Sequence, residues 1–220
     1  MRFKAVLFDM DGVIIDSEPL HRKAYFSMFK EVGIKVSNPL FESFTGQATL
    51  HICTQLVNHF KISQSPESLV AIKRNYFKEL FFNDPALDLI PGVHDLIMDY
   101  YANGMTLVLA SSASMPNINN VFARFDLDKY FVAKLSGADL KASKPHPEIF
   151  LKAAQASGYD KSQCLVIEDS TNGIKAAHNA GIYAVAYNSP NSKNQDYLLA
   201  DKVIVDFNEI TFDKLGKIPT

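Results

Sequence analysis

The sequence contains no tryptophan and only two cysteines among its 220 residues. Cys53 and Cys164 are far apart and outside any paired spacing, which excludes a disulfide framework and a cysteine-based zinc motif. Isolated thiols are typical of a reducing compartment. We therefore expect a cytoplasmic protein.

Long hydrophobic runs and a charge excess are also missing. No stretch of about twenty apolar residues occurs, and acids interrupt the short apolar run near the N-terminus, so we expect neither export nor membrane insertion. The 22 basic residues nearly balance the 24 acidic ones, which argues against a global field that would attract nucleic acid or an anionic membrane. We expect a monomer whose partner is a small molecule, with no nucleic acid and no membrane.

What the sequence does contain is an alternation of short apolar runs and amphipathic segments. Five continuous apolar runs are typical of strands that are buried on both faces: 3–8, 106–110, 164–167, 183–186 and 203–205. Between them, apolar residues three or four apart predict helices within 93–100, 118–125 and 149–154. The alternation predicts an α/β fold with a Rossmann-like parallel sheet that helices cover.

One region interrupts this alternation. Residues 17–87 contain no convincing strand but three amphipathic helical patterns, at 20–32, 50–60 and 69–81. The last begins with Ser65 as N-cap and Pro66 at the first helical position. We therefore predict a helical domain at 17–87, inserted into a core formed by 1–16 and 88–220.

Two acids follow the first predicted strand, at the edge where open parallel sheets bind their ligands. Asp9 and Asp11 are two residues apart, so on an extended backbone both side chains face the same way, and Gly12 permits a sharp exit of the chain. Paired carboxylates repel each other unless a cation or a shared proton compensates. The ordinary alternative is a pair of turn-forming acids. An EF-hand is excluded because the glycine comes too early and the later ligands are absent.

Two later segments could act on a phosphate. The hydroxyls and backbone N–H groups of 109–114 follow a predicted strand and suit phosphate oxygens, although serines there are usually turn and cap residues. Lys144 precedes a proline, which restricts its backbone and helps to aim its ammonium, although a lone lysine is normally solvated.

A further acidic pair, Glu168 and Asp169, ends another predicted strand. Acids there could simply be favourable charges at the N-terminus of the next helix. Together with Asp9 and Asp11 they complete an oxygen site that suits Mg²⁺. Because adjacent side chains tend to diverge, the pattern favours Asp169 over Glu168 as the direct ligand.

These four segments occur in order over nearly the whole chain, and they resemble those of the haloacid dehalogenase superfamily, in the branch of beta-phosphoglucomutase and small sugar phosphatases. The resemblance implies that Asp9 is a nucleophile that forms an aspartyl-phosphate and that Asp11 is the general acid and base. Dehalogenases generally lack an acid at the position of Asp11, so a carbon–halogen substrate is disfavoured. The implied substrate is a small phosphorylated metabolite such as a sugar phosphate.

The resemblance also assigns the surrounding residues. Lys144, with the pocket of Ser111, Ser112 and Ala113, would stabilise the charge of the transferred phosphoryl group. The implied cofactor is Mg²⁺, with Asp9, Asp11, Glu168 and Asp169 as its ligands.

The helical insertion resembles the cap domain of the family, which closes over the site and reads the leaving group. The candidate substrate-binding residues there are His21, Thr45, Gly46, Gln47, Lys73 and Arg74. The helical candidates among them are more often solvated face residues.

Two alternatives to a phosphatase remain. Thr49 stands where phosphomutases of this branch carry an arginine, which weakens the phosphomutase interpretation, although Lys73 or Arg74 could supply that charge. A non-catalytic phospho-aspartate receiver also combines clustered acids, a hydroxyl and a lysine. Receivers, however, are shorter and have no helical insertion.

Overall fold

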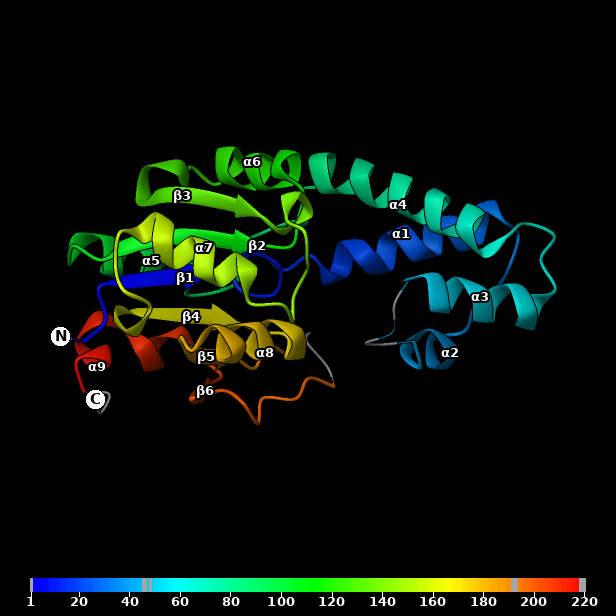
Figure 1. Ribbon diagram of the computed structural model, residues 1–220. Coiled ribbons are helices and arrows are strands. Elements are labelled where there is room, and N and C mark those ends of the chain that lie inside the picture. The colour runs from blue at the N-terminus through cyan, green and yellow to red at the C-terminus, as the bar shows by residue number, and fades with distance from the viewer. Residues whose placement is uncertain (1, 45–46, 48, 191–193, 218–220) are drawn as a thin grey trace. The chain divides into compact units, whose positions relative to one another are not determined.

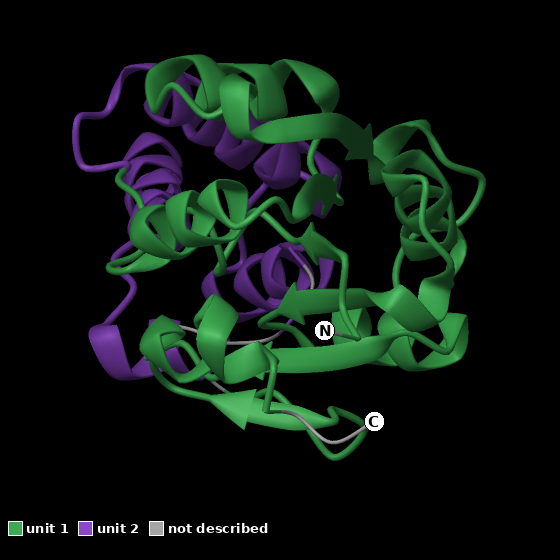
Figure 2. Ribbon diagram, turned by 90° about the vertical axis from the view of Figure 1, so that its left-hand side faces the viewer, with its two compact units in different colours: residues 1–16, 88–220 green, residues 17–87 purple. Residues whose placement is uncertain are grey.

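The computed structural model describes residues 2–44, 47, 49–190 and 194–217. The chain divides into two compact units, Met1–Asp16 with Asp88–Thr220, and Ser17–Leu87 (Figure 2). The first unit is built on a parallel sheet of six strands in the order β3-β2-β1-β4-β5-β6 (Figure 1). The strands are β1 (Ala5–Phe8), β2 (Thr106–Ser111), β3 (Phe131–Ser136), β4 (Cys164–Glu168), β5 (Tyr183–Tyr187) and β6 (Lys202–Ile204). The predicted α/β Rossmann-like fold is confirmed.

Helices cover both faces of this sheet. On one face, Ala5 and Leu7 of β1 belong to a buried cluster with side chains of α7 and α8, which lie in front of the strands in Figure 1. On the other face, the Phe8 ring contacts Tyr100 of α5, with ring centroids 6.4 Å apart. This alternation of direction along β1 explains why the strand is apolar at every position. The helices of this unit are α5 (Val93–Ala102), α6 (Met115–Arg124), α7 (Glu148–Ser157), α8 (Thr171–Ala180) and α9 (Phe212–Leu215), with 3₁₀ turns η1 (Asp128–Tyr130), η2 (Gly137–Asp139), η3 (Lys161–Gln163) and η4 (Phe207–Ile210).

Strand β3 was not among the five predicted strands. It lies at the edge of the sheet, where Val132 keeps 64% of its surface exposed and Lys134 interrupts the apolar run. A one-sided edge strand lacks the continuous apolar run that identified the other strands.

The second unit is helical and consists of α1 (Glu18–Glu31), α2 (Asn38–Glu42), α3 (Thr49–Phe60) and α4 (Pro66–Asn83). Its three longer helices were predicted, whereas the short α2 was not. Helix α4 begins as expected, because the Ser65 hydroxyl accepts a hydrogen bond from the Ser68 N–H. Buried side chains of α1, α3 and α4, among them Met28, Leu56 and Leu69, form a core of its own.

In the described parts of the chain, none of the helices has both the length and the apolar character that crossing a bilayer requires.

Candidate active site

The sheet order places β1 directly beside β4. Strands β2 and β3 follow on one side of this pair, and β5 and β6 on the other, so the strand order reverses between β1 and β4. Open parallel sheets bind ligands at the carboxyl ends of the strands at such a switch point. Asp9 leaves β1 here, and its N–H donates to the carbonyl of Ile167 in β4 at 3.0 Å. The topology therefore brings the first acid of the sequence to Glu168 and Asp169.

Three carboxylates meet at this edge. Asp9, Glu168 and Asp169 each offer an oxygen, and these oxygens lie within 4.8 Å of one another. All three residues are buried. Clustered carboxylate charges in a desolvated place repel each other unless a cation compensates. Carboxylate oxygens are the protein ligands that Mg²⁺ prefers, so the donor set fits this ion.

Lys144 completes the cluster. Its Nζ donates to Asp9 Oδ1 at 2.5 Å and to Glu168 Oε1 at 2.9 Å, and it lies 4.9 Å from the centre of the Phe150 ring. Burial disfavours the charged ammonium, but the two carboxylates outweigh it and raise the pKa of Lys144 above its ordinary value. This lysine is thus an ion-paired group and not a solvated one.

The same neighbours act on Asp9. Burial raises the pKa of Asp9 well above its ordinary value, and the charges of Glu168 and Asp169 add to this effect while Lys144 opposes it. A single ammonium therefore offsets only part of the clustered negative charge. A divalent cation held by the three carboxylates would balance the remainder.

Two glycines provide the space for these acids. A Cβ at Gly12 would lie 2.0 Å from Asp169 Oδ2, and a Cβ at Gly173 would lie 1.7 Å from Glu168 Oε1. Any side chain at Gly12 or Gly173 would therefore overlap one of these carboxylates. Gly12 also has a φ of +81°, as its place in a sharp turn requires. Gly173 was not among the predicted site residues, and its signal is a glycine in the first turn of a helix directly after the acidic pair.

The backbone after β4 explains why adjacent acids converge. The Ser170 N–H donates to Glu168 Oε2 at 2.6 Å, and the Ser170 hydroxyl accepts from the Gly173 N–H at 3.0 Å as the N-cap of α8. Strand β4 ends at Glu168 and Asp169 already lies in the turn that leads to α8 at Thr171, so the divergence expected for neighbours on a strand does not apply. Glu168 and Asp169 both belong to the carboxylate group.

Asp11 occupies a different setting. Strand β1 ends at Phe8, and the Met10 carbonyl accepts hydrogen bonds from the N–H groups of Ile14 and Ile15 at 2.8 and 3.0 Å. Asp11 therefore lies in a tight turn, half-buried and outside the group of three carboxylates. Its assignment as acid, base and metal ligand stays a prediction.

The phosphate pocket predicted at 111–113 follows β2, the strand on the other side of β1. The buried Ser111 hydroxyl accepts from the Ala113 N–H at 3.0 Å, and Ser136 donates to the Ala113 carbonyl at 2.9 Å. These bonds fix a tight turn at the carboxyl edge, in which Ser112 is exposed.

In the helical unit, two of the predicted substrate-binding residues contact each other. Lys73 Nζ of α4 lies 2.6 Å from His21 Nδ1 of α1, and the His21 ring stacks on Phe77 with centroids 4.1 Å apart. Burial, together with the charge of Lys73, lowers the pKa of His21 to about 3, and burial lowers the pKa of Lys73 to about 8. These two residues are therefore not the solvated face residues of the ordinary interpretation.

The other predicted residues of this unit differ from that pair. Arg74 is exposed on α4. Gln47 donates to the Ser43 carbonyl at 2.9 Å and accepts from Gln55 at 2.7 Å. Thr45 and Gly46 lie outside the described residues.

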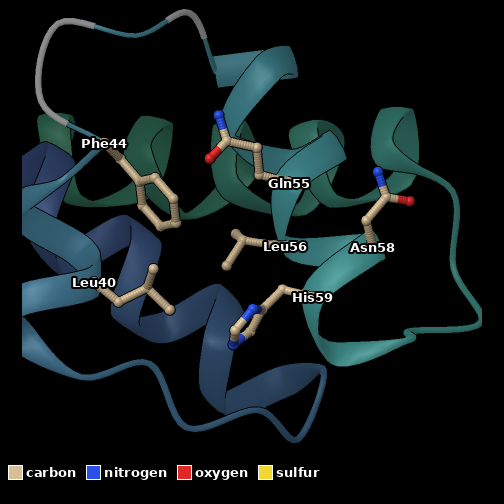
Figure 3. Close-up of a pocket in the computed structure, with 6 residues that line it drawn as sticks. All are labelled: Leu40, Phe44, Gln55, Leu56, Asn58 and His59. Carbon is tan, nitrogen blue, oxygen red and sulfur yellow. The ribbon is translucent and has the colours of Figure 1, made fainter.

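The helical unit also contains a cavity of about 390 Å³ (Figure 3). Its lining residues are Leu40, Phe44, Gln55, Leu56, Asn58 and His59. No lysine or arginine is among them, so it lacks the cationic groups that a phosphate ester requires. The carboxylate cluster remains the candidate for chemistry.

Comparisons with known proteins bear on the family of this chain. Residues 6–187 match the family model of haloacid dehalogenase-like hydrolases. Hexitol phosphatase B of Escherichia coli (strain K12) is 29% identical over 214 residues, which cover 96% of each chain. The phosphorylated carbohydrates phosphatase of Thermotoga maritima is 31% identical over 183 residues, or 81% of this chain and 82% of that protein.

A solved structure supports the same relationship. The crystal structure of beta-phosphoglucomutase from Clostridium difficile superimposes with a TM-score of 0.72 at 26% identity, covering 98% of this chain and 96% of that one. Because the family model spans most of the sequence, including Asp9, Lys144 and the 168–169 pair, the chain is an enzyme that belongs to the haloacid dehalogenase-like hydrolases.

Proposed function

We propose that the protein is a Mg²⁺-dependent phosphatase that acts on a small phosphorylated metabolite, a sugar phosphate, through an aspartyl-phosphate. The observation that carries this proposal is the buried Lys144 between Asp9 and Glu168, with Asp169 beside them, at the switch point of the sheet. This arrangement can neutralise a nucleophilic carboxylate and a phosphate together. Relatives named as hexitol and carbohydrate phosphatases support the substrate class.

In the first step, an Asp9 oxygen attacks phosphorus in line and the bond from phosphorus to the ester oxygen breaks. Asp11 gives its proton to the departing oxygen, which leaves as the sugar hydroxyl. In the second step, water attacks the phosphorus of the aspartyl-phosphate and gives a proton to Asp11. The bond between phosphorus and Asp9 breaks, and inorganic phosphate and the Asp9 carboxylate are restored.

Charge stabilisation comes from the groups around the nucleophile. Lys144 holds Asp9 in place and balances part of the negative charge. The turn of Ser111, Ser112 and Ala113 offers the hydroxyls of its two serines as donors to phosphate oxygens. Asp9, Glu168 and Asp169 would hold Mg²⁺, with Asp11 as a further ligand. The bound ion supplies additional positive charge for the phosphoryl group.

We further propose that residues 17–87 act as a cap that selects the leaving group. His21 and Lys73 are the strongest candidates, because the buried Lys73 ammonium lies 2.6 Å from the half-buried His21 ring and over two aromatic rings. Thr45, Gly46, Gln47 and Arg74 complete the proposed substrate-binding set.

The test is a panel of phosphate esters incubated with the purified protein and Mg²⁺, with free phosphate as the readout. We expect phosphate release from sugar phosphates and its loss, by at least about a thousandfold, in Asp9→Asn. Thermal unfolding of the variant checks that its fold is intact. Unchanged turnover in Asp9→Asn would overturn the proposal.

A phosphomutase is the second candidate, because the solved structure of a beta-phosphoglucomutase shares the fold over nearly the whole chain. It would transfer the phosphoryl group to a sugar hydroxyl instead of water. Conversion of beta-glucose 1-phosphate into glucose 6-phosphate without phosphate release would favour it over the phosphatase.

A further inference from the structure

We infer that Tyr197 is a positioning residue for Asp169, and that residues 195–197 clamp the segment 169–171. The inference rests on the proposed function, in which Asp169 helps to hold a divalent cation. Neither the acidic motif nor the pocket at 111–113 involves this segment, which follows β5.

The central contact is a hydrogen bond to the main chain of the acid itself. The Tyr197 hydroxyl donates to the Asp169 carbonyl at 2.6 Å. The Tyr187 carbonyl oxygen lies 3.4 Å from the Tyr197 hydroxyl oxygen. The ladder between β4 and β5 ends one residue earlier on each strand, at Glu168 and Ala186. Tyr197 thus links the two strand ends directly beyond their last paired residues.

Two neighbours hold the start of α8 in the same way. Gln195 Oε1 accepts from both the N–H and the hydroxyl of Thr171, at 2.8 and 3.0 Å. The Thr171 hydroxyl in turn accepts from the Asp196 N–H at 2.7 Å. The short segment 195–197 therefore contacts both ends of 169–171. Gln195 also accepts the Thr171 N–H, which has no partner within the helix because it lies in the first turn.

These bonds can fix the direction of the Asp169 side chain. Gly12 packs against its carboxylate so closely that a methyl group would not fit, and Tyr197 holds the carbonyl of the same residue. Groups that orient a ligand in this way strengthen metal binding without touching the ion.

The experiment is calorimetric titration of Mn²⁺, without substrate, into wild type and Tyr197→Phe. Removing one hydroxyl leaves the ring packing in place, and we expect the Kd to rise about tenfold, the lower end for an outer-shell contact. Tyr183→Phe is the matched control, because Tyr183 lies on β5 with its ring against Phe3, and its Kd should equal that of wild type. Gln195→Ala tests the same clamp through Thr171 and should weaken binding in the same direction.

Asp169→Asn separates the inference from the proposed function. If Asp169→Asn loses Mn²⁺ binding while Tyr197→Phe and Gln195→Ala bind as wild type does, the clamp is refuted and the metal site stands. If wild type binds no Mn²⁺, or Asp169→Asn binds it unchanged, both ideas fail. A Kd that rises equally in Tyr183→Phe would also overturn the inference, because the effect would then not depend on the contact with Asp169.

Discussion

The two compact units each bury a lysine, and the two lysines behave in opposite ways. The Lys144 side chain is 5% exposed and Lys73 is 4% exposed. Lys144 lies between Asp9 and Glu168, and its pKa is raised. Lys73 lies beside a neutral His21 and over aromatic rings, and its pKa is lowered to about 8.

The comparison shows that the neighbouring groups, and not burial alone, decide whether the pKa of a buried lysine is raised or lowered. Desolvation disfavours the ammonium at both positions. At Lys144 the carboxylates more than compensate, which suits the proposed role of this residue as a cation beside phosphate. At Lys73 the compensation is incomplete, and the helical unit holds an amine that titrates close to neutral pH.

Replacing each lysine by methionine is the strongest test of this contrast. Lys144→Met leaves buried carboxylates without their cation, so we expect a loss of about 3 kcal/mol in the free energy of unfolding. Phosphatase activity should fall by roughly a thousandfold. Lys73→Met removes a poorly compensated charge and should not lower the free energy of unfolding at pH 7 by more than about 1 kcal/mol.

Denaturant unfolding of both variants, with the phosphate-release assay, measures these effects. If both substitutions lowered the free energy of unfolding equally, the different partners of the two lysines would not affect stability.

Gly173→Ala tests the effect of displacing the Glu168 carboxylate from Lys144 while Glu168 itself is kept. The added methyl would collide with Glu168 Oε1, so we expect phosphatase activity to fall by about tenfold or more. Alanine is the better helix former by about 1 kcal/mol, so the free energy of unfolding should not fall in proportion.

Gly158→Ala is the control for this substitution. Gly158 has a φ of +79° and open space around it, so alanine there strains the backbone without reaching the site. It should lower the unfolding temperature and leave kcat unchanged. Full activity in Gly173→Ala would show that the position of Glu168 does not matter.

The smallest expected effect is a pH dependence of stability that comes from Lys73. Burial lowers its pKa from 10.5 to about 8, so between these values the unfolded chain holds a proton that the folded chain has released. Stability therefore rises with pH in this window, by about 2 kcal/mol from pH 8 to pH 10. Urea unfolding of wild type and Lys73→Met at both pH values gives the difference, because the tyrosines titrate alike in the two proteins. The same slope in both would assign the effect to another group.

Several residues that meet at the candidate site could be predicted from short segments of sequence. Asp9 and the 168–169 pair follow apolar runs, and the parallel sheet places the ends of such runs at one edge. Lys144 was indicated by the proline that follows it. The family model independently matches the residues that contain them. Strand β3 and helix α2 escaped prediction, because an exposed edge strand and a helix of five residues have weak periodic signals.

Side-chain directions were less accessible. The rule that adjacent residues diverge failed at Glu168 and Asp169. The Ser170 N–H donates to the Glu168 carboxylate, and the missing side chain of Gly173 leaves room for this carboxylate beside Lys144. Similarly, the extended backbone expected at Asp9 and Asp11 is absent, because β1 ends at Phe8. Local spacing cannot report where a strand stops to within one residue.

The sequence by itself determined the alternation of strands and helices, the helical insertion and the identity of the acids and lysine, because periodicity and residue type are local properties. Tertiary structure alone decided which carboxylates share an edge, which lysine has its pKa raised and which lowered, and that Tyr197 reaches the Asp169 carbonyl. Those outcomes depend on desolvation and on contacts between segments far apart in the chain, and neither is encoded in the spacing of neighbouring residues.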